Sequence, residues 1–390
     1  MSDPVRLPFE QVDPLRRAPE LRELQSRGVI HRVRTAVDDE AWLVVGHAQV
    51  RRLLDDDRLS RGHPAPETAA RTGDSALFGG PLGDFATERA DHTRMRSLLQ
   101  PHFSPKRMRA LRHRAEALTE RLLDDMAEHG SPVDLHTALA LPLPVLVICE
   151  LLGVPYEDRD QFRAWTDDAI NTADRARSEQ GLGALFEYGR KLVARKRANP
   201  CDDVISRLCA TDGVSDLEAA GMSMALLLAG HETTVVQIGM GTLLLLANRE
   251  QWQALVNNPD LVPGAVEELL RASGRGGGIP RYARTDLDID GVTVHAGELV
   301  ILDNGAANHD PAVFADPDQV DVTRPAANHL TFGHGARYCI GAPLARIELQ
   351  VVFRQLATRF PALRLAVDVQ ELTMRHDVLT GGPAELPVRW

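Results

Sequence analysis

Apolar residues recur at helical spacing through the middle of the chain. Between about residues 94 and 270 they are separated mostly by three or four positions, which is typical of helices that bury one face. Pro101, Pro132, Pro155 and Pro200 interrupt this region. Because proline cannot continue a helix, each is expected to mark a helix end. The body of the protein is therefore predicted to be helical.

Short stretches with strand character flank the helical region. Residues 30–34 and 41–45 before it, and 287–294 and 298–302 after it, are rich in apolar and β-branched residues and are bounded by polar turns. Residues 60–84 are rich in glycine, proline and small polar residues, the composition of a long irregular loop. The pattern predicts a fold class that is mainly α with a small β portion.

The longest predicted helix spans residues 215–247. Ser215 and Glu218 form a capping-box pattern at its start, and its length would be roughly 50 Å. Residues 222–246 are apolar on nearly all sides, yet residues 230–234 read Gly-His-Glu-Thr-Thr. An interior glycine costs about 1 kcal/mol relative to alanine, and an unpaired buried polar group costs about 1–3 kcal/mol. A functional reason for this interruption is therefore favoured.

Length and composition are those of a globular protein with a sizeable core. Of 390 residues, 44% are hydrophobic and 25% charged, and no linker-like stretch divides the chain, so one domain over residues 1–390 is expected. The absence of a long apolar run and of a signal peptide predicts a cytoplasmic protein without a membrane anchor. Four scattered cysteines do not suggest a disulfide framework. The net charge of −11 argues against nucleic acid as a partner.

One cysteine lies among three glycines in residues 332–341, which read Phe-Gly-His-Gly-Ala-Arg-Tyr-Cys-Ile-Gly. Gly333, Gly335 and Gly341 lack a Cβ. The backbone around Cys339 can therefore take positive φ values and approach a flat ligand closely. This arrangement indicates a loop that presents a thiolate to a metal.

Cys339 also lies just before a predicted helix over residues 342–360, which has a proline in its first turn. A helix N-terminus lowers the pKa of a nearby thiol. Most cysteines outside disulfides are small buried hydrophobes, and a zinc site would need three or four Cys or His ligands at short spacing. No second cysteine lies near Cys339. An iron atom held by a single axial thiolate fits the pattern better.

Residues 332–341 resemble the cysteine-ligand loop of the cytochrome P450 family, the haem-thiolate monooxygenases. Further motifs follow the order of that family from about residue 90 to the C-terminus. The resemblance implies the cytochrome P450 fold and one haem b (iron protoporphyrin IX), with Cys339 as the metal ligand and Phe332 and Gly341 as cofactor-binding residues. The implied activity is insertion of one oxygen atom from O2 into a C–H bond or an alkene of a small-molecule substrate.

The polar interruption of the long helix matches the acid-alcohol pair of the family. Oxygen activation consumes two protons, and an acid next to a hydroxyl can relay them from water, so the resemblance assigns catalytic roles to Glu232 and Thr233. Gly230 would leave room for dioxygen or substrate against the helix. In a structural alternative, Thr233 bonds back to the carbonyl of Ala229 and Glu232 forms a salt bridge.

Haem carries two propionates, which arginine and histidine side chains can bind. By resemblance, these donors are His92, Arg96, Arg281 and Arg337. His92 and Arg96 would lie one turn apart on a helix. Relatives usually have two prolines and a glutamate before this histidine, whereas residues 88–91 read Glu-Arg-Ala-Asp. The loop that enters the helix is therefore expected to differ in shape.

Glu268 and Arg271 match the Glu-x-x-Arg motif of the family and would share one helix face. Most pairs with this spacing are solvated surface contacts. Here, residues 314–318, Phe-Ala-Asp-Pro-Asp, and the downstream Arg324 resemble the region that supplies a third partner. The resemblance implies a structural role in support of the haem pocket.

A cationic run lies within this acidic chain. It consists of Lys106, Arg107, Arg109, Arg112 and Arg114. Such a run is often only a solvated helix face. Family members, however, receive electrons from NAD(P)H through separate partners, and a basic patch near the thiolate side of the haem would steer an acidic ferredoxin. Ferredoxin and ferredoxin reductase are therefore the expected redox partners, and the enzyme itself is expected to be a monomer.

The substrate is set by loops that follow no simple code. The C-terminal half resembles actinomycete enzymes that tailor macrolides and other polyketides, which implies a bulky secondary metabolite. One alternative is a haem-thiolate enzyme that performs oxidative coupling, rearrangement or peroxide-dependent chemistry on an aromatic or peptide natural product. Another is a non-catalytic recruiting or binding module. A degenerate module would be expected to have lost Cys339 or the pair Glu232 and Thr233, and all three are present.

Overall fold

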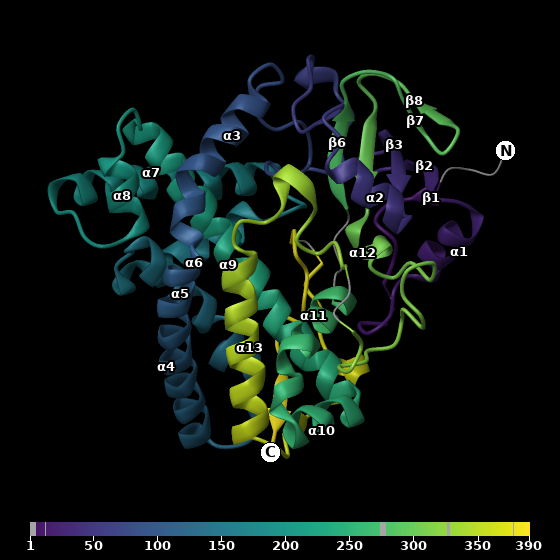
Figure 1. Cartoon of the computed structure of the whole chain (residues 1–390). Helices are drawn as coiled ribbons and strands as arrows, with labels where there is room; N and C mark the ends of the chain where they lie inside the picture. Colours follow the sequence, from purple (N-terminus) through teal and green to yellow (C-terminus); the bar gives the residue numbers. More distant parts are fainter. Residues whose placement is uncertain (1–4, 12, 274–277, 326–327, 377) are drawn as a thin grey trace. The chain divides into compact units, whose positions relative to one another are not determined.

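The computed structural model describes residues 5–11, 13–273, 278–325, 328–376 and 378–390 (Figure 1). The helices are α1 (Pro19–Arg27), α2 (His47–Leu54), α3 (Glu88–Leu99), α4 (Pro105–His129), α5 (Pro142–Leu152), α6 (Arg159–Ala169), α7 (Arg175–Ala198), α8 (Val204–Ala210), α9 (Asp216–Ala247), α10 (Arg249–Asn257), α11 (Val262–Ala272), α12 (Asn304–Ala307) and α13 (Ala342–Arg359). The strands are β1 (Val5–Arg6), β2 (Ile30–Arg34), β3 (Glu40–Val44), β4 (Leu59–Ser60), β5 (Val133–Asp134), β6 (Ile279–Ala283), β7 (Leu287–Ile289), β8 (Val292–Val294), β9 (Leu299–Leu302), β10 (Arg364–Leu365) and β11 (Pro387–Arg389).

The chain forms two compact units, each assembled from separate segments. Unit 1 contains Met1–Thr93, Thr172–Arg175 and Glu267–Cys339. Unit 2 contains Arg94–Asn171, Ala176–Val266 and Ile340–Trp390. Unit 1 holds the largest sheet, and unit 2 holds the longest helices. The expectation of one domain over residues 1–390 stays a prediction.

The main sheet of unit 1 has the strand order β1-β2-β3-β9-β6-β4. β2 and β3 are antiparallel, with Ile30 opposite Val44, whereas β3 and β9 are parallel, with Trp42 opposite Val300. β6 pairs antiparallel with the other edge of β9. All four residues of β9 are buried, as expected for a central strand that is covered on both faces.

Successive side chains of this sheet pack against different helices. Leu43 of β3 shares a core cluster with Leu21 of α1, whereas the next residue, Val44, shares one with Val50 and Leu53 of α2. Because successive side chains of a strand point to opposite faces, α1 and α2 cover opposite faces of the sheet. Burial of each such side chain contributes about 1.5–3 kcal/mol, so these clusters hold the early and late segments of unit 1 together.

Unit 2 is built around α9, which is buried along most of its length. Helices α5 and α13 pack against α9, and α4 packs against both of them. Figure 1 shows α4 and α13 running side by side. Between these two helices, Gln355 donates to the backbone oxygen of Glu116 at 3.1 Å, and Arg112 donates to Gln350 at 2.7 Å.

The main predicted elements are confirmed, with one local difference. The hydroxyl of Ser215 caps α9 by accepting a hydrogen bond from the N–H of Glu218, and the carboxylate of Glu218 pairs with Arg94. The apolar stretch at residues 287–294 is a hairpin of β7 and β8, because both residues of its Asp-Gly turn have positive φ. The mainly helical class with a small β portion follows from these elements.

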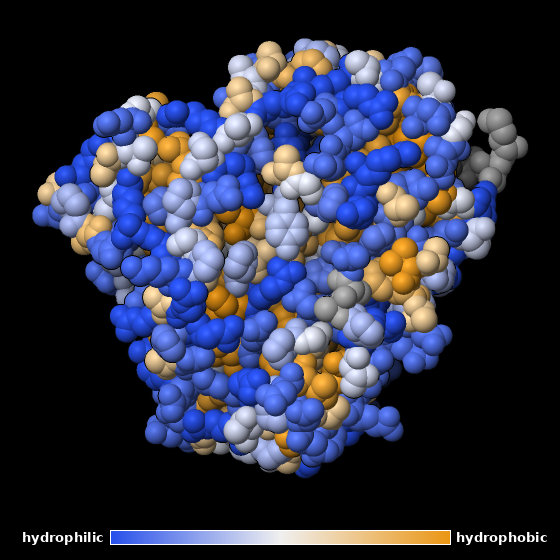
Figure 2. All heavy atoms as spheres, in the orientation of Figure 1, coloured by the Kyte–Doolittle hydropathy of each residue, from blue (hydrophilic) through white to orange (hydrophobic). Residues whose placement is uncertain are grey.

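Within the described residues, no helix combines the length and the apolar composition that crossing a membrane requires. On the face drawn in Figure 2, hydrophilic residues predominate, and hydrophobic residues form small patches between them. Exposed large hydrophobic side chains include Tyr156 and Leu217. Scattered exposures of this kind are ordinary and indicate no apolar interface by themselves.

Candidate active site

The predicted thiolate loop is closed by backbone hydrogen bonds. The N–H of Cys339 donates to the carbonyl oxygen of Phe332 at 2.8 Å, and the N–H of Tyr338 donates to that of Gly335 at 3.0 Å. Gly333 and Gly335 have φ values of 73° and 66°, as the glycine pattern predicts. Cys339 is exposed. The closed loop therefore presents this side chain and does not bury it in the core.

Gly341 differs from the other two glycines of the motif. Its φ is −81°, a value open to any residue, so the expectation of a positive φ applies only to Gly333 and Gly335. Gly341 is the N-cap of α13, which begins three residues after Cys339 and has a proline in its first turn. The predicted position of the cysteine just before a helix is confirmed.

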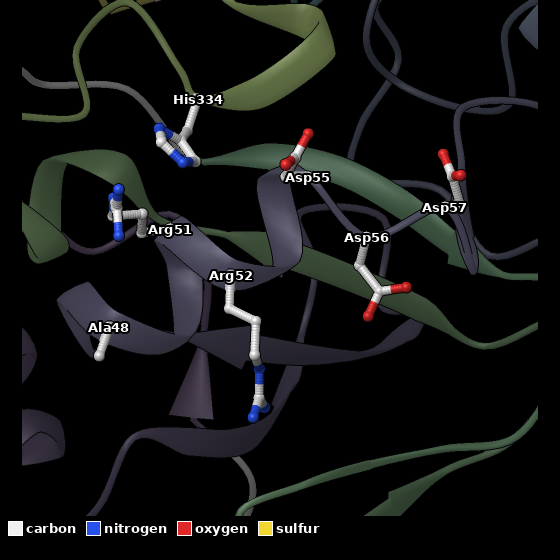
Figure 3. Close-up of a pocket in the computed structure, with 7 residues that line it drawn as sticks. All are labelled: Ala48, Arg51, Arg52, Asp55, Asp56, Asp57 and His334. Atoms are coloured by element: carbon white, nitrogen blue, oxygen red, sulfur yellow. The ribbon is translucent and has the colours of Figure 1, made fainter.

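A carboxylate from the end of α2 supports the thiolate loop. Asp55, the C-cap of α2, accepts a hydrogen bond from the N–H of Ala336 at 3.0 Å. A Cβ at Gly335 would clash with the same carboxylate, so only glycine lets the loop approach α2 this closely. Figure 3 shows Asp55 beside His334 of the loop, in a polar pocket of about 490 Å³. The other side chains that line this pocket are Ala48, Arg51, Arg52, Asp56 and Asp57.

Arginines of unit 1 gather around one carboxylate, that of Glu88. Arg337 and Arg284 both form ion pairs with it, the latter at 3.3 Å. The same carboxylate accepts hydrogen bonds from the hydroxyl of Ser60 and from the N–H of Arg61. Burial alone would raise the pKa of Glu88, but these hydrogen bonds and the charge of Arg337 together hold it below its usual value. Glu88 is therefore an anion in this setting.

Arg281 completes the arginine cluster of Arg61, Arg281, Arg284 and Arg337. It is buried, and its guanidinium donates to the carbonyl oxygen of Pro280 at 2.8 Å. Burial, followed by the charges of Arg61 and Arg337, lowers the pKa of Arg281 to about 9. In the part of the chain that the structure describes, one carboxylate does not balance four guanidinium groups, so the arginine cluster has the chemistry of a site for further carboxylates.

The four predicted propionate donors fall in two places. Arg281 and Arg337 belong to the arginine cluster, whereas His92 and Arg96 lie one turn apart on α3, both partly exposed. The first residue of α3 is Glu88. The stretch that departs from the family pattern therefore supplies the carboxylate of the arginine cluster.

The Glu-x-x-Arg pair forms a buried network in unit 1. Arg271, whose side chain has no exposed surface, binds both oxygens of Glu268 at 2.7 Å. Arg324 pairs with the same carboxylate at 3.1 Å and is the predicted third partner. Arg271 also donates to the backbone oxygens of Asn308, Pro317 and Gln319. Loss of one partner from a buried pair costs about 3–5 kcal/mol, so the predicted structural role is supported.

Glu232 is buried in unit 2 with polar partners. Its Oε1 accepts hydrogen bonds from Arg375 at 2.8 Å and from Thr380 at 3.1 Å. Its Oε2 has no hydrogen-bond partner among the described residues. Burial raises the pKa of Glu232, and the charge of Arg375 only partly opposes this effect. A carboxyl group with a raised pKa is better suited to proton exchange near neutral pH than an exposed glutamate.

Thr233 is exposed on α9, and its hydroxyl donates to the carbonyl oxygen of Ala229 at 2.9 Å. Both contacts of the structural alternative are therefore present, because Glu232 also forms a salt bridge with Arg375. Both contacts leave free the atoms that a proton relay would use. The oxygen of Thr233 keeps lone pairs that can accept a hydrogen bond, and neither contact engages Oε2 of Glu232. Ala225, Ala229 and Thr233, spaced by four residues, form an exposed stripe on α9.

Gly230 has a packing role that the sequence does not indicate. A Cβ at this position would come within 2.7 Å of Cδ1 of Ile148 on α5. Its expected place beside dioxygen or substrate stays a prediction. Gly230 lets α5 and α9 pack closely.

The sequence pattern does not reveal the partners of Glu232 or of Arg337. Arg375 and Thr380 are 143 and 148 positions from Glu232 along the chain, and Glu88 is 249 positions from Arg337. Only Glu88 carried a signal, because it lies where the sequence departs from the family pattern. No local sequence pattern marks residues 375–376 and 378–380, the C-terminal segment, as part of the site.

The chain is similar to proteins of one known family. The family model for cytochrome P450 matches residues 184–381. The chain is 44% identical to pentalenolactone synthase of Streptomyces exfoliatus, with 100% of both proteins covered. It is 40% identical to the mycinamicin IV hydroxylase/epoxidase of Micromonospora griseorubida, with 100% of this chain and 99% of that protein covered. The solved structure of PimD, a polyene macrolide antibiotic pimaricin epoxidase, matches with a TM-score of 0.90, 39% identity and complete coverage of both chains.

The chain belongs to the cytochrome P450 family. It is an enzyme of the monooxygenase class, and the family implies a haem-thiolate iron. The residues present fit that group. The loop presents one thiol that can bind iron, and the arginine cluster can bind the carboxylates of the two propionates. The predicted fold class is confirmed by the structural match.

Proposed function

We propose that the protein is a haem-thiolate monooxygenase that inserts one oxygen atom from O2 into a C–H bond or an alkene of a bulky secondary metabolite. The observation that carries this proposal is the closed loop that presents Cys339, with Arg337 of the same loop in a cluster of more arginines than carboxylates. Both features belong to unit 1. Haem b suits both, because it offers an iron atom to the thiolate and two propionates to the guanidinium groups.

In this proposal, Cys339 is the protein ligand of the iron, and Phe332 keeps the loop closed by accepting the N–H of the cysteine. Gly341 leads from the loop into α13 and lies next to the bound cofactor. The propionate donors are His92, Arg96, Arg281 and Arg337. When bound, haem supplies the activation of O2.

Glu232 and Thr233 would handle the protons that oxygen activation consumes. Burial raises the pKa of Glu232, so its carboxyl group can hold a proton and release it through Oε2. The hydroxyl of Thr233 already donates to Ala229 and can therefore accept a hydrogen bond from the group that carries the next proton. The acid would supply the proton, and the alcohol would orient it.

The electrons would come from NAD(P)H through ferredoxin reductase and ferredoxin. The family implies separate redox partners, and the exposed side chains of Lys106 and Arg109 on α4 suit an acidic ferredoxin. Arg112 and Arg114 are engaged by other side chains of unit 2, so the docking face would be narrower than the whole cationic run. A monomer in the cytoplasm is part of the same proposal.

The carbon monoxide difference spectrum of the ferrous protein tests the thiolate assignment. We expect a Soret band far to the red of that of a histidine-ligated haem in the wild-type protein and in Cys201→Ala, and its loss in Cys339→Ser. Cys201 is a matched control because it is also an exposed cysteine. A histidine-type band in fresh protein, or a red-shifted band that survives in Cys339→Ser, would contradict the proposal.

We propose a macrolide or another bulky polyketide as the substrate. The support is the similarity to a mycinamicin IV hydroxylase/epoxidase and to a pimaricin epoxidase. Titration of the haem spin state with mycinamicin IV, a polyene macrolide, and small aromatic and peptide compounds tests this assignment. A saturable shift with macrolides alone, and a product heavier by one oxygen atom, are expected. Coupled or rearranged products would point to the alternative enzyme chemistry, and binding without turnover would point to a non-catalytic module.

A further inference from the structure

A buried polar region of unit 2 surrounds Glu232 and extends beyond the acid itself. It lies where α6, α9 and the C-terminal segment meet. The rings of Phe162 on α6 and His231 on α9 are 5.8 Å apart between centroids. The N–H of Leu379 donates to the carbonyl oxygen of Ile170, just after α6, at 3.1 Å. The C-terminal segment is therefore fixed to the end of α6 on one side and to Glu232 on the other.

Several polar atoms of this region have no hydrogen-bond partner among the described residues. They are Nδ1 and Nε2 of His231, Oε2 of Glu232 and Oγ1 of Thr166. His231 has no exposed surface, and burial, followed by the charges of Arg163 and Arg375, lowers its pKa to about 3. Buried polar groups that the protein does not satisfy are usually satisfied by ordered water. Oε2 of Glu232 is therefore available to ordered water.

One cation links the buried acid to the solvent. Arg375 donates to Oε1 of Glu232 at 2.8 Å and lies 3.5 Å from Oδ1 of Asp167 on α6. The side chain of Asp167 is 43% exposed, whereas that of Glu232 is 2% exposed. The remaining titratable and charged groups that face this region are His136, His231, Arg163 and Asp134. A single guanidinium therefore lies between a carboxylate in water and an acid in the interior.

We propose that Arg375 and Asp167 form the entry through which protons reach Glu232. When Arg375 pairs with Asp167, the buried carboxyl loses its compensating charge and takes up a proton at Oε2 from water. When Arg375 returns to Glu232, it favours the carboxylate and hence the release of that proton. The guanidinium acts in this scheme only through its position and its charge.

Arg375 and Asp167 are positioning residues in this scheme, and Thr380 holds Oε1 so that Oε2 is the oxygen that exchanges the proton. The inference rests on the proposed role of Glu232 as the proton donor and adds where its protons come from. The C-terminal segment would therefore help to control proton uptake by Glu232, a role that its sequence does not suggest.

The protonation state of Glu232 tests this arrangement without turnover. An infrared carboxyl band that is absent in Glu232→Gln reports the protonated acid. In Arg375→Gln, we expect the pH at which this band disappears to rise by about 1–3 units, because the acid loses a neighbouring cation. In Asp167→Asn, we expect it to fall, because Arg375 then stays with Glu232. Arg375→Lys and Asp167→Glu keep the charges and should titrate like the wild-type protein.

Asp168→Asn is the matched control for Asp167→Asn. Asp168 is the next residue on α6, but its partner is Arg177, at 2.6 Å. Its replacement removes the same charge from the same helix and should leave the band unchanged. An unshifted band in Asp167→Asn, or an equal shift in Asp168→Asn, would overturn the proposal. Asp167 is a surface residue, so this comparison remains available if Arg375→Gln does not fold.

Proton delivery during turnover provides a second readout. In Asp167→Asn, we expect product formation to slow by about tenfold, with hydrogen peroxide released instead and a larger rate difference between H2O and D2O. Asp168→Asn and Asp167→Glu should match the wild-type protein. If the wild-type protein lacks the red-shifted carbon monoxide band, the proposed function fails, while the infrared titration still decides the proton entry. A normal band with wild-type titration and isotope effect in Asp167→Asn would refute the proton entry alone.

Discussion

At the scale of single residues, the neighbouring threonines of α9 differ in environment and allow a controlled comparison. Thr233 is exposed, whereas Thr234 is 4% exposed. We expect Thr233→Ala to lower the ratio of product to O2 consumed several-fold and to raise peroxide release, because the hydroxyl that orients the proton is lost. Thr233→Ser keeps the hydroxyl and should stay coupled, as should Thr234→Ser. Full coupling in Thr233→Ala would mean that the bond to Ala229 is the whole role of this side chain.

A second buried acid, Glu348 on α13, has no part in the proposed mechanism. Its side chain is 1% exposed, and Oε2 has no hydrogen-bond partner in the described part of the chain. Burial raises its pKa to about 8. In an unfolded chain, glutamate titrates near about 4.3. The folded state therefore binds one more proton than the unfolded state across the interval between these values.

The free energy of unfolding should consequently fall as the pH rises through that interval, by about 1.4 kcal/mol per pH unit from this group. Glu348→Gln cannot ionise and should remove this contribution. Urea unfolding of both proteins at about pH 5 and about pH 7.5 measures the effect. The stability of the variant relative to the wild-type protein should increase with pH. Parallel pH profiles would show that Glu348 is ionised or hydrated in the native protein.

At the scale of elements, the end of α2 is tied to the thiolate loop through one carboxylate. Asp55→Ala removes the acceptor for the N–H of Ala336. A hydrogen bond to a charged group contributes about 1.5–3 kcal/mol, so we expect the loop to release its thiolate at a lower urea concentration. The measurement is the loss of the red-shifted carbon monoxide band in a urea series.

Two variants control this experiment. Asp55→Asn retains an acceptor oxygen and should keep most of the wild-type resistance. Asp57→Ala removes a carboxylate from the same polar pocket, but Asp57 pairs with Arg89, so the band should persist as in the wild-type protein. Equal sensitivity of Asp55→Ala and Asp57→Ala would show that general charge, and not the bond to the loop, is responsible.

Elements were predictable where a local pattern determines them. The apolar stretch of β9 and the long apolar run of α9 are visible in the local sequence, and the glycines around Cys339 define their loop within ten residues. The sheet of β10, β11 and β5 was not predictable, because its strands have only two or three residues each. Its pairing also joins residues that are far apart in the sequence, such as Val133 and Val388. The same limit applies to the site. Glu88 and Arg375 reach their partners only through tertiary contacts, and Gly230 looks alike in sequence whether a ligand or Ile148 fills the space beside it.

At the scale of the whole molecule, the net charge of −11 would oppose the approach of the proposed acidic ferredoxin, so its docking would depend on a local cationic face. We expect replacement of both Lys106 and Arg109 by Glu to raise the KM for ferredoxin by about tenfold at low salt and to weaken the salt dependence of reduction. Arg121→Glu changes an exposed residue further along α4 and serves as the control. Reduction that is equal in all variants would identify the cationic run as a solvated helix face.

The segmental make-up of the two units matters for recombination between relatives. Because each unit combines three stretches of chain, a chimera with a single crossover inside Arg94–Asn171 or Ala176–Val266 exchanges part of both units. The stretch Glu267–Cys339 is different. It carries Glu268, Arg271, Arg324 and Cys339 together with β6 and β9, so the cysteine and the Glu268 network can be exchanged as one block. Chimeras made to change the substrate range should therefore take this block from a single parent and vary the segments around it.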